Sequence, residues 1–333
     1  MDARASARPL RIGGSSLADI RTGGLRNAEL PFTGVPPGDR HKIPKPRYRI
    51  RMRTRRAGSM LIAAIGVLGV TIAMAHAQQI WAGGYGQMPP RLPTARTFSG
   101  GFNFCRLWFG SDHREKQGWR TDYPGADINF SIRISELTKI TVTMRDGYNE
   151  EPEPDAVVVR LTDDALFQCP FVLMEDAGTA RFSAIEAQRL HDYLVKGGFL
   201  LAADYHGSYG REQFDEEIGR VLPRALYPIF DITPPHPHPI WSTMFNVTTL
   251  PQMASINTWR RTGDVIERWN EDGSPPSARA IVDEQGRIMV MMVHNTDLPD
   301  PWEREGEDKD YFYRFSPDAY AAGIDILIYS MTH

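Results

Sequence analysis

Hydrophobic residues in the last two thirds of the chain gather in short runs that alternate with amphipathic stretches. Four runs have the length and composition of β-strands: FNFCRLWF (102–109), AVVVRL (156–161), FVLM (171–174) and FLLAA (199–203). Three of them are almost continuously apolar, as is typical of strands covered on both faces. We therefore expect these runs to form the buried strands of one sheet.

Helical patterns lie between the strand-like runs. Ser183 and Glu186 have the spacing of a capping box, the apolar residues after them keep helical spacing, and Gly197 is expected to end this helix. Residues 210–222 (GREQFDEEIGRVL) predict a second helix. The pair Ser316-Pro317 predicts the start of a last, largely buried helix, because proline suits the first helical position.

Two further segments contribute to the expected fold. Residues 126–137 (ADINFSIRISEL) fit both strand alternation and helical spacing, and we favour a helix. Residues 278–294 predict a hairpin that turns at Glu284-Gln285-Gly286. The alternation of strands and helices implies a three-layer α/β fold with a mainly parallel sheet and helices on both faces. Ligands bind such sheets beyond the carboxyl ends of the strands, which makes residues after strands the first candidates.

The N-terminal part has a different character. Residues 52–77 combine arginines, an apolar core of about 15 residues and the sequence Ala75-His76-Ala77, which predicts a signal peptide. The alternative is a membrane anchor over residues 60–75, although a spanning helix needs roughly 20 residues. Residues 1–51 are rich in Arg, Gly and Pro and have no periodic apolar pattern, so we expect them to be disordered. They either result from a start codon that is set too early or form the cytoplasmic tail of an anchored protein.

Charge supports the same division. Residues 1–77 carry 14 Lys and Arg against 4 Asp and Glu, whereas the remaining 256 residues carry 24 against 37. An acidic domain argues against nucleic acid or anionic lipid as a partner. We expect an exported protein, periplasmic or extracellular, with a Gly/Pro-rich linker at 78–100 and a single α/β domain at 101–333.

Two cysteines, Cys105 and Cys169, follow the leader. An even pair in an oxidising compartment favours a disulfide. Both also lie in or beside apolar runs, where a free cysteine behaves as a small hydrophobic residue. The sequence leaves both alternatives open.

Candidate chemistry begins at the end of the run 199–203, where Asp204 and His206 follow. A carboxylate and an imidazole there suit acid–base catalysis or a divalent metal, and the alternative is a helix cap beside an exposed histidine. His238 in TPPHPHPIW (233–241) is a second candidate, with a spacing to His236 that is compatible with a metal. Proline-fixed turns also hold loops without any ligand.

Two more segments supply polar and aromatic candidates. His294 and Asn295 end the predicted hairpin and precede Trp302, a combination that suits a sugar-like ligand, although an exposed acidic loop explains the segment as well. After the first strand, Trp119, Asp122 and Tyr123 are candidates for the same pocket. Arg106 lies within that strand, where it binds a ligand or, as we favour, forms a structural ion pair.

Several motifs together resemble a bacterial family, the domain of unknown function numbered 4159. They are FNFCRLWF (102–109), GWRTDYPGADINF (118–130), GGFLLAAD (197–204), HPIWSTMF (238–245), HNTDLPDPWE (294–303) and AAGIDILIYSMTH (321–333). The family is similar to the class I glutamine amidotransferase-like group, which includes the ThuA-like proteins. The resemblance implies a flavodoxin-like sheet and a protein that is exported or attached to a membrane.

The amidotransferase likeness also predicts what is missing. Those enzymes carry a cysteine nucleophile at a sharp turn after a strand, and here the turn after 199–203 holds Asp204 instead of cysteine or serine. The chain contains no G-x-S-x-G motif either. We therefore expect a non-catalytic envelope module that binds a protein or a small, carbohydrate-type ligand. The alternative is a hydrolase or isomerase that uses Asp204 with His238 or His294. No cofactor is expected, although a divalent metal is compatible with these residues.

Overall fold

The computed structural model describes residues 88–333, apart from 113–117, 148–150, 268–269 and 272. The predicted leader, signal peptide or anchor and the first part of the linker lie outside the described residues. Among the helices that the structure describes, none is long and apolar enough to cross a membrane.

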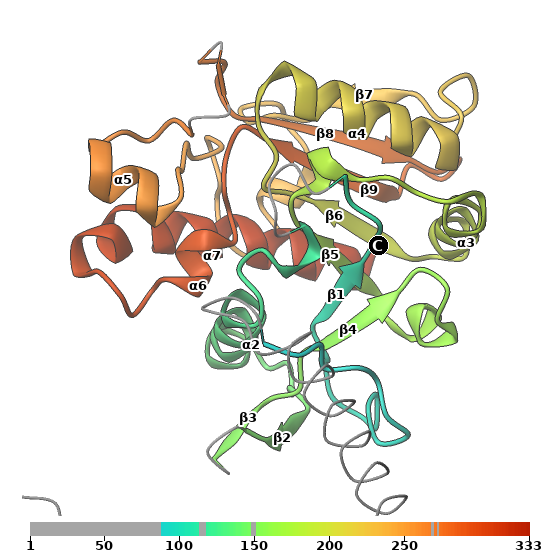
Figure 1. The fold of residues 1–333 in the computed structure, drawn as a ribbon, viewed down its shortest axis with the longest axis horizontal. Helices are drawn as coiled ribbons and strands as arrows, with labels where there is room; N and C mark the ends of the chain where they lie inside the picture. The colour runs from blue at the N-terminus through green and yellow to red at the C-terminus, as the bar shows by residue number, and fades with distance from the viewer. Residues whose placement is uncertain (1–87, 113–117, 148–150, 268–269, 272) are drawn as a thin grey trace, which may run out of the picture. The chain divides into compact units, whose positions relative to one another are not determined.

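A seven-stranded sheet forms the centre of the described chain (Figure 1). Its strand order is β4-β1-β5-β6-β9-β8-β7. The first five strands are parallel, β8 pairs antiparallel with β9, and β7 pairs antiparallel with β8. The strands are β4 (Val157–Arg160), β1 (Cys105–Trp108), β5 (Phe171–Met174), β6 (Phe199–Ala202), β9 (Ile288–His294), β8 (Ser277–Val282) and β7 (Ile229–Asp231). The prediction of a mainly parallel sheet is confirmed.

The helices and one small hairpin complete the fold. The α-helices are α2 (Gly125–Leu137), α3 (Ala184–Val195), α4 (Gly207–Val221), α5 (Ile256–Thr262), α6 (Asp300–Glu303) and α7 (Lys309–Thr332). Short 3-10 helices are η1 (Gly118–Arg120), η2 (Asp164–Gln168), η3 (Ala177–Thr179) and η4 (Pro239–Trp241). Strands β2 (Met144–Asp146) and β3 (Pro152–Pro154) pair separately.

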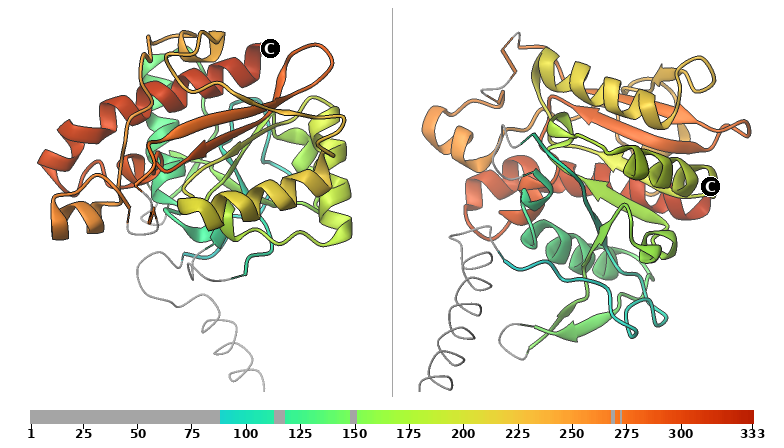
Figure 2. Two further views of the ribbon diagram at one scale, coloured as in Figure 1. Left: turned by 90° about the horizontal axis from the view of Figure 1, so that it is seen from above. Right: turned by 45° about the vertical axis from the view of Figure 1, so that its right-hand side comes forward.

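The sheet divides the interior into two apolar layers because successive side chains of a strand point to opposite faces. Phe171 and Leu173 of β5 pack with α2 and α7, whereas Val172 and Met174 pack with α3 and α4. Figure 2 shows the sheet between α7 on one side and α3 with α4 on the other. This double coverage explains why β5 and β6 are apolar at every position.

The residue patterns located most elements correctly. Ser183 caps α3 with a complete capping box, in which its side chain accepts from the Glu186 N–H. The ambiguous segment is a helix, and the hairpin of β8 and β9 turns where the sequence predicts. Helix α4 begins at Gly207, three residues before the predicted start at Gly210.

The predicted start of the last helix is wrong. Helix α7 begins at Lys309 and contains Pro317 in its interior. Asp308 caps it instead, since the Asp308 side chain accepts from the backbone N–H groups of Asp310 and Tyr311. A capping carboxylate at the true N-terminus outweighs the preference of proline for the first turn.

Residues before the domain also contact it. The Arg91 carbonyl accepts from the Val158 N–H, and the Arg91 N–H donates to the Tyr123 hydroxyl at 2.9 Å. The C-terminal part of the predicted linker therefore runs beside β4, the edge strand of the sheet.

A disulfide joins Cys105 at the start of β1 to Cys169 just before β5. It lies at the amino ends of the parallel strands, because both cysteines precede or begin their strands. The disulfide therefore lies at the opposite ends of the parallel strands from any ligand site at their carboxyl ends.

Reduction of this disulfide should lower the free energy of unfolding by about 2–5 kcal/mol, because the bridge spans 64 residues and restricts the unfolded chain. Urea denaturation with and without dithiothreitol measures the change. In a Cys105→Ala/Cys169→Ala variant the reductant should have no effect. An equal response of both proteins to the reductant would show that the bridge does not stabilise the fold.

Candidate ligand-binding site

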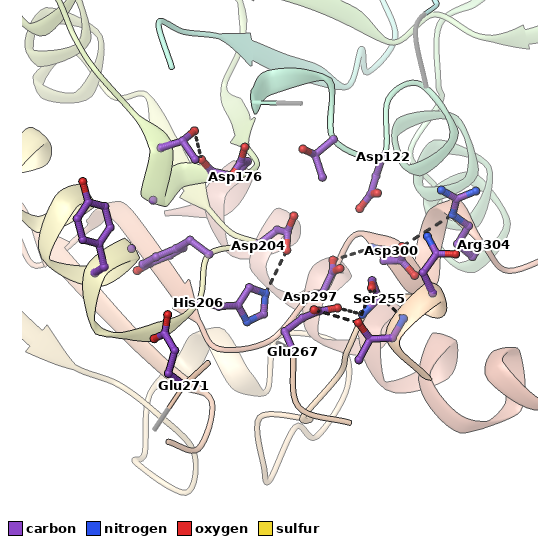
Figure 3. A pocket seen from close by; sticks show the side chains of 18 of the residues that line it. Asp122, Asp176, Asp204, His206, Ser255, Glu267, Glu271, Asp297, Asp300 and Arg304 are labelled. Atoms are coloured by element: carbon purple, nitrogen blue, oxygen red, sulfur yellow. Dashed lines mark hydrogen bonds and ion pairs between the residues drawn. The ribbon is translucent and has the colours of Figure 1, made fainter. Parts of the chain in front are cut away.

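A cavity of about 310 Å³ opens at the carboxyl ends of the parallel strands, where the α/β sheet rule places ligands. Figure 3 shows that acidic side chains surround it. The described lining residues include seven carboxylates against two arginines, Arg261 and Arg304. The carboxylates are Asp122, Asp176, Asp204, Glu267, Glu271, Asp297 and Asp300.

Backbone geometry explains why aspartates occur at the strand ends. Asp122, Asp176 and Asp204 have φ values of 57°, 52° and 49°, and Asn295 after β9 has 60°. Asp and Asn tolerate this left-handed conformation better than other residues with a side chain. The sharp turns after β5, β6 and β9 therefore favour residues that also bring polar groups to the same edge.

Asp204 and His206 form a pair on the wall of the cavity. The Asp204 Oδ1 atom lies 3.2 Å from the His206 Nε2 atom, and both residues line the cavity. The side chain of His206 is 5 % exposed, and its Nδ1 atom has no hydrogen-bond partner among the described residues. The pair thus has the elements of an acid–base unit.

Three carboxylates form a tighter cluster beside this pair. One oxygen each from Asp122, Asp297 and Asp300 lies within 4.8 Å of the others, and all three residues are buried. Burial and mutual repulsion raise the pKa of Asp122 and of Asp297 well above the ordinary value. Burial also raises the pKa of Asp300 to about 7, although hydrogen bonds from Tyr311 and Ile256 oppose this shift.

Glu267 organises a neighbouring part of the wall. Its Oε1 atom accepts from the Ser255 N–H at 2.8 Å, and its Oε2 atom accepts from the Thr258 hydroxyl at 3.1 Å. Burial opposes ionisation, but these hydrogen bonds outweigh it and lower the pKa of Glu267. Glu267 therefore fixes the start of α5 with a charged carboxylate.

Beneath the cavity, Arg106 of β1 joins three segments. Its guanidinium donates to Asp127 of α2 at 2.9 Å, to Glu175 after β5 at 2.8 Å and to the Thr121 carbonyl at 2.7 Å. Arg106, Asp127 and Glu175 are all fully buried. Burial raises the pKa of both carboxyl groups, although the guanidinium acts in the opposite direction. The ion pair that the sequence favoured for Arg106 therefore exists.

His294 and Asn295 lie behind the cavity wall rather than on it. The His294 Nε2 atom is 2.9 Å from the Gly207 carbonyl, and burial lowers the pKa of His294 to about 4. The Asn295 side chain accepts from the Gly207 N–H at 2.9 Å. Both residues join the end of β9 to the start of α4, which is a structural arrangement.

The structure does not bring His238 and Asp204 together, since Asp204 lines the cavity and His238 is not among the described lining residues. The His238 ring lies 5.6 Å from the ring of Tyr329, near the end of α7. Tyr311, at the start of α7, contacts Asp300 in the cavity through its hydroxyl. Tyr311 and Tyr329 are 18 positions apart, which is roughly 27 Å along the helix. His238 and the cavity therefore lie near opposite ends of α7, too far apart for direct or single-water proton transfer.

The three predicted aromatic ligands are buried in the protein. Trp119 stacks on Trp108, and Trp302 packs against Phe130 in the apolar layer. The Tyr123 hydroxyl contacts Arg91. Among the described residues, the aromatic side chains on the cavity wall are instead Tyr205 and Tyr209.

Sequence reasoning missed part of the site. It left the segment after Asn295 open between a ligand site and an exposed acidic loop, and the structure buries both Asp297 and Asp300, which are at most 4 % exposed. Asp176 follows a predicted strand in the same way as Asp204, and the strand-end rule applies to it equally. No pattern in the sequence locates Glu267, because it reaches the cavity from an irregular segment.

The fold and cavity define a mixed α/β protein with an acidic pocket at the carboxyl edge of a mainly parallel sheet. Residues 108–331 match the model of the family described as Domain of unknown function (DUF4159), and the chain belongs to this family. None of the curated proteins matches the chain.

Replacement of Arg106 by methionine should lower the free energy of unfolding by about 3–5 kcal/mol at pH 7, because it leaves two buried carboxylates without their cation. Without Arg106 the pKa values of Asp127 and Glu175 rise further in the folded state. A carboxyl group whose pKa is raised in the folded state favours the folded protein below its unfolded pKa of about 4. This contribution to the free energy of unfolding is lost as the pH rises. The decrease in the free energy of unfolding that Arg106→Met causes should therefore be smaller at pH 5 than at pH 7, as measured by urea denaturation.

Arg260→Met is the matched control, since Arg260 pairs with Glu307 and Asp308 at the surface. The decrease in the free energy of unfolding of Arg260→Met should stay below about 1 kcal/mol and vary little with pH. A pH-independent loss in Arg106→Met, or a loss no larger than in the control, would contradict the role given to Arg106.

Proposed function

We propose that this protein binds a small, hydroxyl-rich or cationic ligand of the carbohydrate class in the acidic cavity. The observation that carries the proposal is the convergence of seven carboxylates on one cavity at the sheet edge. Carboxylates accept hydrogen bonds from hydroxyl and ammonium groups but repel phosphates and other anions. A volume of about 310 Å³ lies within the range of small-molecule sites.

The wall also offers the mixed chemistry that a sugar needs. The ring of Tyr209, which is half exposed, lines the cavity together with Ser255, Asn257 and Thr258. An aromatic face packs against the apolar face of a sugar ring, while hydroxyl and amide groups fix its orientation.

The Asp204–His206 pair supports a second candidate function, acid–base catalysis on the same ligand class. The two side chains are in hydrogen-bond contact on the cavity wall, and further carboxylates face them. Hydrolysis or isomerisation of a sugar requires a proton donor and a proton acceptor at the same site. In this second candidate function, the histidine that acts together with Asp204 is His206 and not His238, which the sequence had suggested.

We also infer that the sheet is flavodoxin-like, as in the amidotransferase-like group. Along the chain, the five parallel strands have the spatial order second-first-third-fourth-fifth. This is the flavodoxin order, in which the switch lies between the first and third strands, here β1 and β5. Asp176, which follows β5, lines the cavity.

The disulfide supports an exported location for the protein. Structural disulfides persist in oxidising compartments such as the periplasm or the extracellular space. Such a location agrees with the basic, apolar leader of the sequence, and envelope glycans or proteins would then be accessible to the acidic domain.

A thermal-shift screen of the full chain tests the proposal with neutral sugars, amino sugars, polyamines and sugar phosphates. The screen is run once in EDTA and once with added calcium and magnesium, and a shift in either buffer counts as binding. A bound ligand at about 100 times its Kd should raise Tm by roughly 5–10 °C. Sugar phosphates should give no shift in EDTA.

Asp204→Asn and His206→Gln should remove the shift, whereas His238→Gln is the matched control and should retain it. Asparagine suits the left-handed backbone of residue 204, so the variant isolates the charge. The proposal fails if no neutral or cationic compound shifts Tm in either buffer, or if Asp204→Asn responds as the wild type does.

A further inference from the structure

The charge balance around Asp122, Asp297 and Asp300 is incomplete. These residues come from three separate segments: the turn before α2, the loop after β9 and the first residue of α6. They are 8 %, 4 % and 3 % exposed, so water screens their charges poorly. Like charges this close destabilise a folded protein unless a cation or protons compensate them.

Among the described residues, one buried oxygen of the cluster accepts no hydrogen bond from an N–H or hydroxyl group. Asp300 Oδ2 accepts from the Tyr311 hydroxyl at 2.7 Å and from the Ile256 N–H at 2.8 Å. Asp297 Oδ1 accepts from the Asp300 N–H at 3.0 Å. Asp122 Oδ2, by contrast, is buried and accepts from no N–H or hydroxyl group among the described residues; the carboxyl of Glu303 is beside Asp122 and can donate to it only when protonated.

The orphaned oxygen belongs to a side chain that lines the cavity. Asp122 is more than nine-tenths buried, and Figure 3 shows it beside Asp297 and Asp300 on the same side of the cavity. A buried acceptor with no donor costs free energy and is rare in native proteins. A bound cation would supply the missing partner.

Neither Arg304 nor Arg106 fills this position. The Arg304 Nε atom lies 3.8 Å from Asp300 Oδ1 but only 2.6 Å from Glu303 Oε2, and its Nη1 atom contacts Glu307 at 2.6 Å. Arg304 is therefore directed mainly at the two glutamates. Arg106 binds Asp127 and Glu175 rather than the cluster.

We propose that Asp122, Asp297 and Asp300 bind one hard divalent cation of the calcium, magnesium or manganese class. Their oxygen-only donor set matches these ions, whereas zinc prefers nitrogen and sulfur ligands. Two oxygens on one calcium ion lie at most about 5 Å apart, because each lies 2.3–2.6 Å from the metal. The three oxygens lie within 4.8 Å of one another, which satisfies this limit for calcium, whereas magnesium, with bonds of about 2.0–2.1 Å, needs them within about 4.2 Å.

The cation site extends the proposed function. It rests on that function in one respect, because the ion is also expected to contact the bound ligand. Calcium takes six to eight oxygen ligands, and three carboxylates leave coordination positions for ligand hydroxyls or water. The cation also neutralises part of the acidic wall. Uptake of the cation itself does not depend on the proposed ligand.

Calorimetric titration of the EDTA-treated full chain with calcium, magnesium or manganese chloride alone tests this inference. We expect saturable uptake of one ion per chain and a higher Tm in its presence. Asp122→Asn and Asp297→Asn should weaken binding at least tenfold, since even outer-shell partners of metal ligands contribute 10- to 100-fold. Asp318→Asn removes an exposed charge from α7 and should bind as the wild type does.

A second readout separates loss of the cation from damage to the fold. In EDTA, Asp122→Asn should be at least as stable as the wild type, because it removes a buried charge and asparagine suits the backbone of residue 122. With saturating cation, the wild type should become the more stable protein. If the variant does not fold, the wild-type titration decides alone.

The inference is overturned if the wild type binds none of the three cations, or if Asp122→Asn binds them with unchanged affinity. Cation uptake without any sugar or polyamine shift would overturn the proposed function alone. A ligand shift in EDTA without cation uptake would overturn only the cation site.

Discussion

The buried Arg106 ion-pair network is the constraint on which the site depends. From the middle of β1, this side chain reaches α2 through Asp127, the end of β5 through Glu175, and the turn before α2 through the Thr121 carbonyl. Glu175 and Thr121 are the immediate neighbours of Asp176 and Asp122, which line the cavity. One guanidinium therefore fixes the backbone on two sides of the site, and the fold could not replace it with an apolar residue without leaving two carboxylates unpaired.

The cavity concentrates negative charge at the edge of the sheet where ligands bind, while the disulfide lies at the opposite edge. Left-handed backbone at Asp122, Asp176 and Asp204 makes aspartate suitable for these turns on conformational grounds alone. Conformation does not explain why Asp297 and Asp300 are buried beside Asp122, since neither has a positive φ. Hydrogen bonds from the Tyr311 hydroxyl and the Ile256 N–H hold Asp300 in this position, and the proposed cation would compensate the negative charge that they leave.

Periodicity predicted the fold well and the site only in part. Continuous apolar runs identified β5 and β6, and the capping box identified α3, because these signals are local. The start of α7 depends on a second local signal, the Asp308 cap, that competes with Ser316-Pro317, whereas the position of His238 depends on contacts between distant segments. His238 and His294 follow recognisable patterns, yet tertiary packing places His238 near Tyr329 and His294 behind Gly207. The burial of Asp297 and Asp300 could not be predicted, because charge density in a sequence does not reveal which charges the fold buries.

The central claim is that the buried carboxylates of Asp122, Asp297 and Asp300 form a binding site for a divalent cation. Manganese provides the most direct test of this claim. A crystal of the protein grown with manganese should show one anomalous-difference peak within coordinating distance of Asp122, Asp297 and Asp300. The account predicts that the peak is absent from crystals of Asp122→Asn. A fully occupied manganese ion elsewhere with this cluster empty, or an identical peak in the variant, would contradict it.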